Sequence, residues 1–297
     1  MSPQRRLLML TILTAGLIGG GVFLWQRDAA NTEPQRELVA NPSADARAID
    51  PDEIPLVSTI SRREQLADGY TLNIEYPKLS LVSHPALADQ ASDVIARAVQ
   101  DQIDAFARDV RSLSKADGDE AAPPSVESSF TLRSTMLLVS PSIVSVRFDS
   151  SGYVAGAAHP NNRSTILNYS LVDHTTLRTE ELFASSTEAL PFLAETSRTK
   201  LRAILGSVTE EEFRAFVVPG TEPTAENFAN VGITPRGLVI VFPPYQIAPG
   251  AMGAIEVKLD TADYGPQFAE TIRRAMTLAV ENIEIAAPET RTPNLPE

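Results

Sequence analysis

Three histidines, His84, His159 and His174, and the absence of cysteine limit the chemistry open to this 297-residue chain. A protein zinc site needs three or four cysteine, histidine or carboxylate ligands, and no two of these histidines lie close enough in sequence to form a ligand pair. No serine lies in a Gly-x-Ser-x-Gly motif, which exposes the nucleophile in one large class of hydrolases. We therefore predict no catalytic residue, no metal site and no cofactor.

One enzymatic alternative stays open. His159 could act as a general base if the fold placed it between a serine and an acid such as Asp149 or Asp173. The chain contains many serines, and its spacing singles out none of them as the nucleophile. The alternative function is accordingly an envelope hydrolase that uses His159.

The segment 152–162 has the most distinctive composition in the chain. Its candidate binding residues are Tyr153, Gly156, His159, Pro160 and Asn161. Tyr153 would supply an apolar face and His159 and Asn161 would supply polar groups for recognition. A second interpretation is that glycine permits an unusual backbone turn while the polar side chains bond to neighbouring main chain. The sequence is compatible with both interpretations.

A second proline-rich segment, 243–253, contains further candidate binding residues, namely Pro244, Tyr245, Pro249 and Gly253. Proline restricts the backbone and would hold such a loop in one shape. Tyr245 could then face a partner, or it could simply fill the edge of the core with its ring.

Three segments in this order resemble the extracellular domain of RsiV-type lysozyme-sensing anti-sigma factors and the matching non-catalytic region of PdaC-type peptidoglycan deacetylases. They are Tyr70-Thr-Leu-Asn-Ile-Glu-Tyr-Pro77, Gly156-Ala-Ala-His-Pro-Asn161, and a third that begins at Asn227-Phe228, passes through Gly237-Leu238 and ends with Phe242-Pro-Pro-Tyr-Gln-Ile-Ala-Pro-Gly250 and Gly253. Together they span most of residues 68–262. Ala157 stands where this family usually has a second glycine, and Gly250 stands where it often has an aromatic residue.

The resemblance implies an α+β domain that is non-enzymatic in the sensors and presents loops to a protein partner such as lysozyme. Two departures narrow what it implies. Only residues 1–6 precede the apolar N-terminal segment, where the sensors carry a sigma-binding region, and no metal-binding catalytic domain follows Asn282. We therefore expect neither anti-sigma nor deacetylase activity.

Hydrophobic periodicity predicts the elements that must position these segments. Alternating apolar residues predict a strand at 70–76, and apolar residues at three- and four-residue steps predict a helix of about 25 residues after Pro85. Further strands are expected at 130–139, 143–148, 164–172, 228–233, 237–242 and 253–259, and further helices at 189–205, 209–217 and 266–282. This order favours an α+β fold, with a mostly antiparallel sheet packed against two long helices, over a doubly wound parallel sheet.

The N-terminal region contains an uncharged apolar run at residues 7–25. Its length suits a transmembrane helix, and Arg5 and Arg6 before it favour a cytoplasmic N-terminus with the rest of the chain outside. The alternative is a cleaved signal peptide, with Gly19-Gly20-Gly21 near the cleavage site. We predict a single-pass inner (plasma) membrane protein whose main domain is periplasmic or extracellular, or a secreted protein if the leader is cleaved.

The rest of the chain divides by composition. Residues 1–6 form the cytoplasmic tip, and proline-rich polar residues 26–65 are predicted to be a disordered linker. One globular domain is expected at 66–285, with sub-regions 66–120 and 126–285, followed by a disordered tail at 286–297.

The acidic balance restricts the partners. A formal charge of −13 argues against nucleic acid, because phosphates require a basic surface. An acidic domain favours a cationic protein such as lysozyme, and peptidoglycan is the second ligand that we consider. The predicted function is that of a membrane-anchored binding or sensing module of the bacterial cell envelope.

Overall fold

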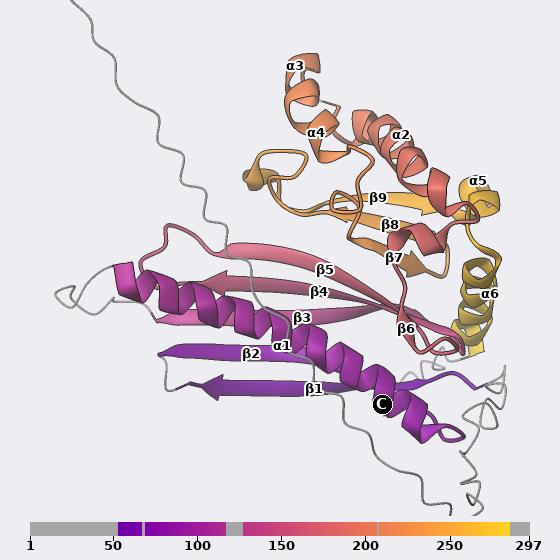
Figure 1. Ribbon diagram of the computed structural model, residues 1–297, viewed down its shortest axis with the longest axis horizontal. Coiled ribbons are helices and arrows are strands. Elements are labelled where there is room, and N and C mark those ends of the chain that lie inside the picture. The colour runs from indigo at the N-terminus through magenta and orange to yellow at the C-terminus, as the bar shows by residue number, and fades with distance from the viewer. Residues whose placement is uncertain (1–52, 67–68, 117–126, 207, 286–297) are drawn as a thin grey trace, which may run out of the picture. The chain divides into compact units, whose positions relative to one another are not determined.

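Six strands form one mixed sheet in the computed structural model, which describes residues 53–66, 69–116, 127–206 and 208–285. In spatial order they are β1 (Leu56–Gln65), β2 (Tyr70–Ser80), β3 (Ser128–Val139), β4 (Ile143–Tyr153), β5 (Asn161–Ser170) and β6 (Thr175–Thr176). Neighbouring strands are antiparallel except β2 and β3, which are parallel. Parallel strands need a crossover connection, usually a helix, and helix α1 (Pro85–Ala116) provides it (Figure 1).

Helix α1 covers one face of this sheet. The apolar residues that predicted the helix form its buried side, among them Leu87, Ala91, Ile95, Ile103, Phe106 and Val110. They pack with alternate residues of the strands, including Leu72, Ile74, Phe130, Leu132, Val144, Val146 and Phe148. The alternation arises because successive strand side chains point to opposite faces. Residues such as Ser145 and Arg147, between these core positions, therefore point to the face opposite α1.

A second, three-stranded antiparallel sheet has the order β7 (Val231–Thr234), β8 (Gly237–Phe242) and β9 (Ile255–Asp260). Helices α2 (Ser186–Ile204) and α6 (Glu270–Ile285) share a core with it, which includes Leu193, Leu201, Phe242, Val257, Phe268 and Ile272. Shorter helical segments are η2 (Thr179–Leu182), α3 (Glu210–Glu212), a π-helical turn η3 (Phe213–Val217), α4 (Val218–Gly220), η4 (Gly250–Met252), α5 (Thr261–Tyr264) and η5 (Gly265–Gln267).

Buried hydrogen bonds join the two sheets on the face opposite α1. The Ser145 hydroxyl donates to the Asn168 side chain (2.7 Å), and the Asn168 amide donates to the Val231 carbonyl (2.7 Å). The backbone N–H of Ile233 donates to the Ser145 oxygen (3.1 Å). Both sheets belong to one compact unit, residues 46–297.

The α+β class predicted from the sequence is confirmed, but the strands form two sheets where one was expected, and the boundary of the linker was wrong. Residues 56–65, which we assigned to the linker 26–65, form β1, and β1 pairs with β2 along its whole length. The predicted tip 1–6, the apolar segment 7–25, most of the linker and the tail 286–297 lie outside the described residues. Within the described ranges, no helix combines the length and apolar character required to cross a membrane.

Candidate functional site

A cleft of about 340 Å³ lies between strands β3–β5 and the connection from β8 to β9. Its lining residues are Thr131, Arg133, Asp149, Ser150, Ser151, Asn162, Arg163, Ser164, Pro244, Gly253 and Ala254. Most of these residues are polar, and they come from segments about ninety positions apart in the sequence. The cleft therefore exists only because the connection between β8 and β9 folds back over the larger sheet.

Strand pairing arranges the polar residues of the cleft in rows across β3, β4 and β5. Arg133 pairs with Asp149, and Asp149 pairs with Ser164, so the three lie side by side. Arg133 forms an ion pair with Glu75 of β2. The Ser164 hydroxyl donates to the Asp149 carboxylate (2.5 Å). The charged residues of this first row, which we call the ionic row, therefore already have partners.

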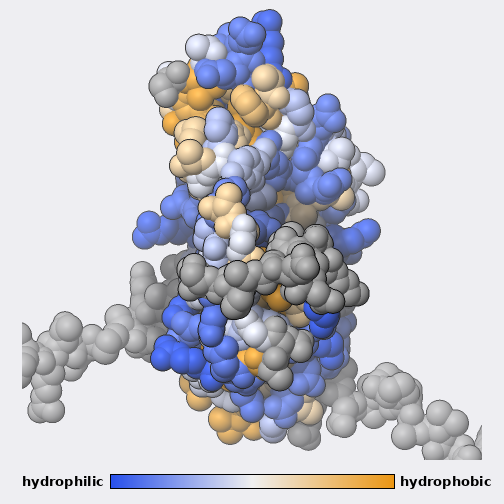
Figure 2. Space-filling view, turned by 90° about the vertical axis from the view of Figure 1, so that its left-hand side faces the viewer, coloured by the Kyte–Doolittle hydropathy of each residue, from blue (hydrophilic) through white to orange (hydrophobic). Residues whose placement is uncertain are grey.

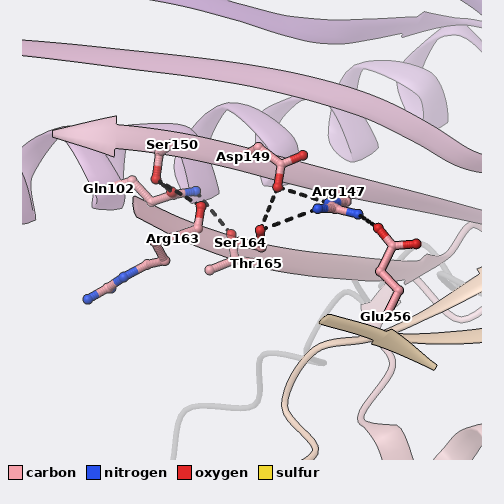
Figure 3. A network of polar contacts seen from close by, with 8 residues as sticks. All are labelled: Gln102, Arg147, Asp149, Ser150, Arg163, Ser164, Thr165 and Glu256. Atoms are coloured by element: carbon pink, nitrogen blue, oxygen red, sulfur yellow. Dashed lines mark hydrogen bonds and ion pairs between the residues drawn. The ribbon is translucent and has the colours of Figure 1, made fainter. Parts of the chain in front are cut away.

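Arg147 connects the first row to the second sheet (Figure 3). Its guanidinium binds Asp149 (2.9 Å) and Glu256 of β9. Burial opposes the charge on Arg147, but the hydrogen bonds to Glu256 and Asp149 outweigh that effect and raise the pKa of Arg147. Arginine is protonated at any physiological pH, so Arg147 keeps its positive charge in this contact between the two sheets.

The second row consists of Thr131, Ser151 and Asn162, which pair in that order across the same strands. In the part of the chain that the structure describes, the side chains of these three residues make no hydrogen bond or ion pair. Tyr153 follows Ser151 by two positions and therefore points to the same face. The cleft thus offers a row of free neutral donors and acceptors with an aromatic ring beside it.

A separate network holds the opposite face of the same strands to α1 (Figure 3). The Ser150 hydroxyl donates to Gln102 (3.0 Å), and the Gln102 amide donates to Thr165 (3.2 Å). Arg163 pairs directly with Ser150, and directly opposite residues point to the same face of a sheet. Although both residues border the cleft, their side chains belong to the α1 face.

The connection between β8 and β9 is held in place by two amide side chains. Gln246 donates to the carbonyls of Gly220 (2.8 Å) and Asn227 (2.9 Å). Asn227 donates to the carbonyls of Pro219 (3.0 Å) and Glu222 (3.1 Å). Asn227, which begins the third resembling segment, thus orders residues 219–227, and carbonyls of this segment hold Gln246 of the connection that borders the cleft.

Both ends of the first candidate segment lie on strands in the structure. Tyr153 is the last residue of β4 and is half-buried, and Asn161 is the first residue of β5. Between them, Gly156 has a φ of +88°, which glycine adopts without steric cost. Pro160 is exposed beside His159.

The exposed ring of His159 contacts the Pro160 carbonyl (Nδ1 to O, 3.1 Å). Within the described ranges, no hydrogen bond joins His159 to a serine or an acid. The arrangement shown is thus one of side chain to neighbouring main chain, and it contains no assembled catalytic triad. No group of three or more histidine, aspartate or glutamate residues in the described chain could hold a metal ion.

Tyr245 of the second segment does not fill the edge of the core. Its side chain is 69% exposed, and its φ of +71° is unusual for a residue other than glycine. A methyl group at Gly250 would lie 2.1 Å from the ring of Tyr245, so the two residues are in close contact. Pro249 is exposed. Of the four predicted residues, Pro244 and Gly253 line the cleft, while Tyr245 and Pro249 do not.

Sequence reasoning missed Thr131, Ser151, Asn162 and the ionic row beside them. Each lies on the outward side of a strand, where polar residues normally face solvent. The signal that could have found them is the concentration of serine, threonine and asparagine on three consecutive strands.

Comparison with known proteins places this geometry in a structural context. Residues 180–262 match the family described as a protein of unknown function (DUF3298). A DUF3298 protein from Bacteroides fragilis has a similar structure, with a TM-score of 0.55 and 16% identity over 76% of this chain and 99% of that one. Another from Pseudomonas aeruginosa has a TM-score of 0.53 and 15% identity over 74% and 97%. At this identity the similarity shows the fold alone.

No curated protein matches the sequence. The matched range, residues 180–262, contains the second sheet and the β8–β9 connection but not strands β1–β5. The residues on the sheet side of the cleft therefore lie outside the part that matches the DUF3298 family.

Proposed function

We propose that the domain is a non-enzymatic binding module of the bacterial cell envelope, and that its ligand occupies the cleft between β3–β5 and the β8–β9 connection. Peptidoglycan fragments are the first ligands to test. In this proposal residues 7–25 hold the protein at the membrane with the domain outside the cytoplasm, as in the RsiV-type sensors that the sequence resembles.

One observation carries the proposal, which is the row of unbonded polar side chains in the cleft. Thr131, Ser151 and Asn162 face the space that Pro244 and Gly253 border from the other side. Ligand sites are concave and contain a few polar groups that converge. Polar side chains that bond to no other described residue are available to a ligand, whereas the ionic row beside them is already paired.

Co-sedimentation of the full-length protein with purified peptidoglycan tests this function. Wild type should sediment with the insoluble polymer, and Ser151→Arg should reduce the bound fraction at least about tenfold by placing a long side chain in the cleft. Ser80→Arg is the matched control, because Ser80 is an exposed position near the end of β2 and does not line the cleft. Absence of wild-type sedimentation, or an equal loss in both variants, would contradict the proposal.

A cationic protein such as lysozyme is the second candidate partner, and different observations favour it. The chain carries a formal charge of −13. Tyr245 and Met252 expose 69% and 48% of their side chains on the β8–β9 connection. Hydrophobic residues also gather over the end of the domain that carries α3 and α4 (Figure 2), where Phe216 is 41% exposed. Exposed apolar residues on an acidic domain suit a basic protein surface.

Surface-binding measurements with lysozyme separate this candidate from the first. If lysozyme binds, the association rate should fall as salt rises, because exposed charges are screened beyond about 10 Å at 0.1 M salt. Tyr245→Ala should then weaken binding by about 1 kcal/mol or more, and Ser151→Arg should not. Lack of binding at low salt would remove this candidate.

A further inference from the structure

We propose that the cleft is built for uncharged sugar rings, with Thr131, Ser151 and Asn162 as the hydrogen-bonding row and Tyr153 as the stacking surface. This inference rests on the proposed function and specifies the chemistry of its ligand. It excludes a ligand recognised through a charged group.

The spacing of the row suits a chain of hydroxyl groups. Neighbouring strands lie about 4.8 Å apart, so Thr131, Ser151 and Asn162 extend over about 10 Å across the sheet. Threonine and serine hydroxyls both donate and accept, and an asparagine amide offers two donors and an acceptor. A sugar presents hydroxyls around its edge that need the same mixture of partners.

The charged side chains on the same face as the row already have partners among the described residues. Arg133 binds Glu75, and Arg147 binds both Asp149 and Glu256. An ionic ligand would have to compete with these pairs. Arg163 has no ion-pair partner among the described residues, but its pairing with Ser150 directs it to the α1 face. The face that the row occupies is therefore polar without a free charge.

Tyr153 does not line the cleft itself, but it lies next to it on the same face, at the end of the row away from Arg147. It pairs with Ser129 and lies about 7 Å along β4 from Ser151, on the same face. Its half-buried position limits the freedom of the ring. An aromatic ring packs against the apolar C–H face of a sugar while the sugar edge bonds to polar groups, and tyrosine combines an apolar body with a polar tip.

Binding of two tetrasaccharides to the full-length protein tests the inference. The neutral probe is tetra-N-acetylglucosamine and the anionic probe is tetragalacturonate. We expect the neutral probe to bind better and its affinity to change little between low and high salt. Ser151→Ala should weaken it about fivefold and Tyr153→Ala about tenfold. Arg108→Gln is the matched control, because Arg108 is exposed on α1 and does not line the cleft, and it should leave the affinity within about a factor of two.

Tyr153→Leu separates stacking from folding, because leucine keeps apolar bulk at the position while removing the flat ring. It should fold with a native melting curve and still bind the neutral probe more weakly than wild type. Preference for the anionic probe, an equal loss of binding in Arg108→Gln, or unchanged binding in Ser151→Ala and Tyr153→Ala would each overturn the inference.

The two levels of the argument fail separately. If peptidoglycan sediments the protein but neither tetrasaccharide binds, the sugar assignment is wrong while the proposed function stands. If peptidoglycan does not sediment the protein either, both are wrong.

Discussion

Arg147 of β4 forms an ion pair with Glu256 of β9, and this contact links the six-stranded sheet to the three-stranded sheet beside the cleft. The arginine side chain is only 18% exposed, and it also binds Asp149. The same residue therefore connects the sheets and pairs with one of the acids that line the cleft.

Replacing Arg147 with methionine should lower the free energy of unfolding by about 2 kcal/mol, because the mostly buried guanidinium of Arg147 holds two carboxylates at once. Arg133→Met is the matched control. The ion pair of Arg133 with Glu75 is more exposed, at 46% and 40%, and such pairs contribute less than about 1 kcal/mol. Urea denaturation measures both variants, and equal losses would contradict the special role of Arg147.

The buried polar bridge between the sheets should be even less tolerant of change. Asn168→Leu removes the donor to the Val231 carbonyl and the acceptor for Ser145. Because these groups would stay buried without partners, we expect a loss of about 2–3 kcal/mol. Asn162→Leu on the same strand is exposed and should change stability by less than about 0.5 kcal/mol. If the denaturation curve of Asn168→Leu matched that of wild type, the hydrogen bonds of Asn168 would not be what stabilises the contact between the sheets.

Local periodicity in the sequence predicted most of these elements. The apolar residues spaced along 87–110 form the buried side of α1, and the run 237–242 corresponds to β8 (Gly237–Phe242). Strand β2 continues past Pro77, where we expected it to end. Beyond Ile74 this strand has β1 as its only described sheet neighbour, and proline is tolerated at such edge-like positions.

Strand β1 was missed for a physical reason. From Ile60 on, half-buried and exposed residues alternate along it, but two of the half-buried residues are Arg62 and Glu64, so the apolar alternation that marks a half-buried strand is absent from the sequence. The β-branched residues Val57, Thr59 and Ile60 were the remaining signal. That signal was outweighed by the proline-rich segment before it.

Two glycines should respond differently to alanine. A methyl group at Gly237 would lie 1.9 Å from the Leu259 carbonyl oxygen, which is backbone of the neighbouring strand and cannot move aside. Gly253 has a φ of +71° but no atom within 4 Å of such a methyl group. We expect Gly237→Ala to cost more than about 3 kcal/mol and Gly253→Ala about 1–3 kcal/mol from backbone strain alone, because its φ of +71° and ψ of −158° are essentially restricted to glycine. Comparable melting temperatures for the two variants would contradict the close approach of Gly237 to the Leu259 carbonyl.

Glu212 should make the stability of the α3 region depend on pH. Its carboxylate accepts hydrogen bonds from the backbone N–H (2.9 Å) and hydroxyl (2.8 Å) of Thr209, and these bonds lower the pKa of Glu212. The ionised form is therefore favoured in the folded state. Its contribution is present above the unfolded value of about 4.3 and is lost as the pH falls through the lower folded value.

Glu212→Gln should consequently be less stable than wild type near pH 7, and the difference should shrink as the pH falls below the unfolded value of about 4.3. Thermal denaturation at neutral pH and at a series of acid pH values measures this. A deficit that stays constant or grows in acid would show that the charge of Glu212 is not what stabilises the helix start.

The cleft could not be found from local sequence patterns. Pro244 and Gly253 were recognised as distinctive, but nothing in the sequence shows that they lie against Ser151 and Asn162. That contact depends on Gln246 and Asn227 anchoring the β8–β9 connection and on Arg147 binding Glu256. Long-range contacts of this kind are set by tertiary packing and leave no periodic signature.

Backbone amide NMR of the full-length protein, titrated with soluble peptidoglycan fragments, tests the central claim most directly. If the cleft is the ligand site, the amides that shift should be those of Thr131, Ser151, Asn162 and Gly253, together with their strand neighbours. Shifts confined to the exposed residues Tyr245, Met252 and Phe216, or no shifts at all, would contradict a ligand site in the cleft.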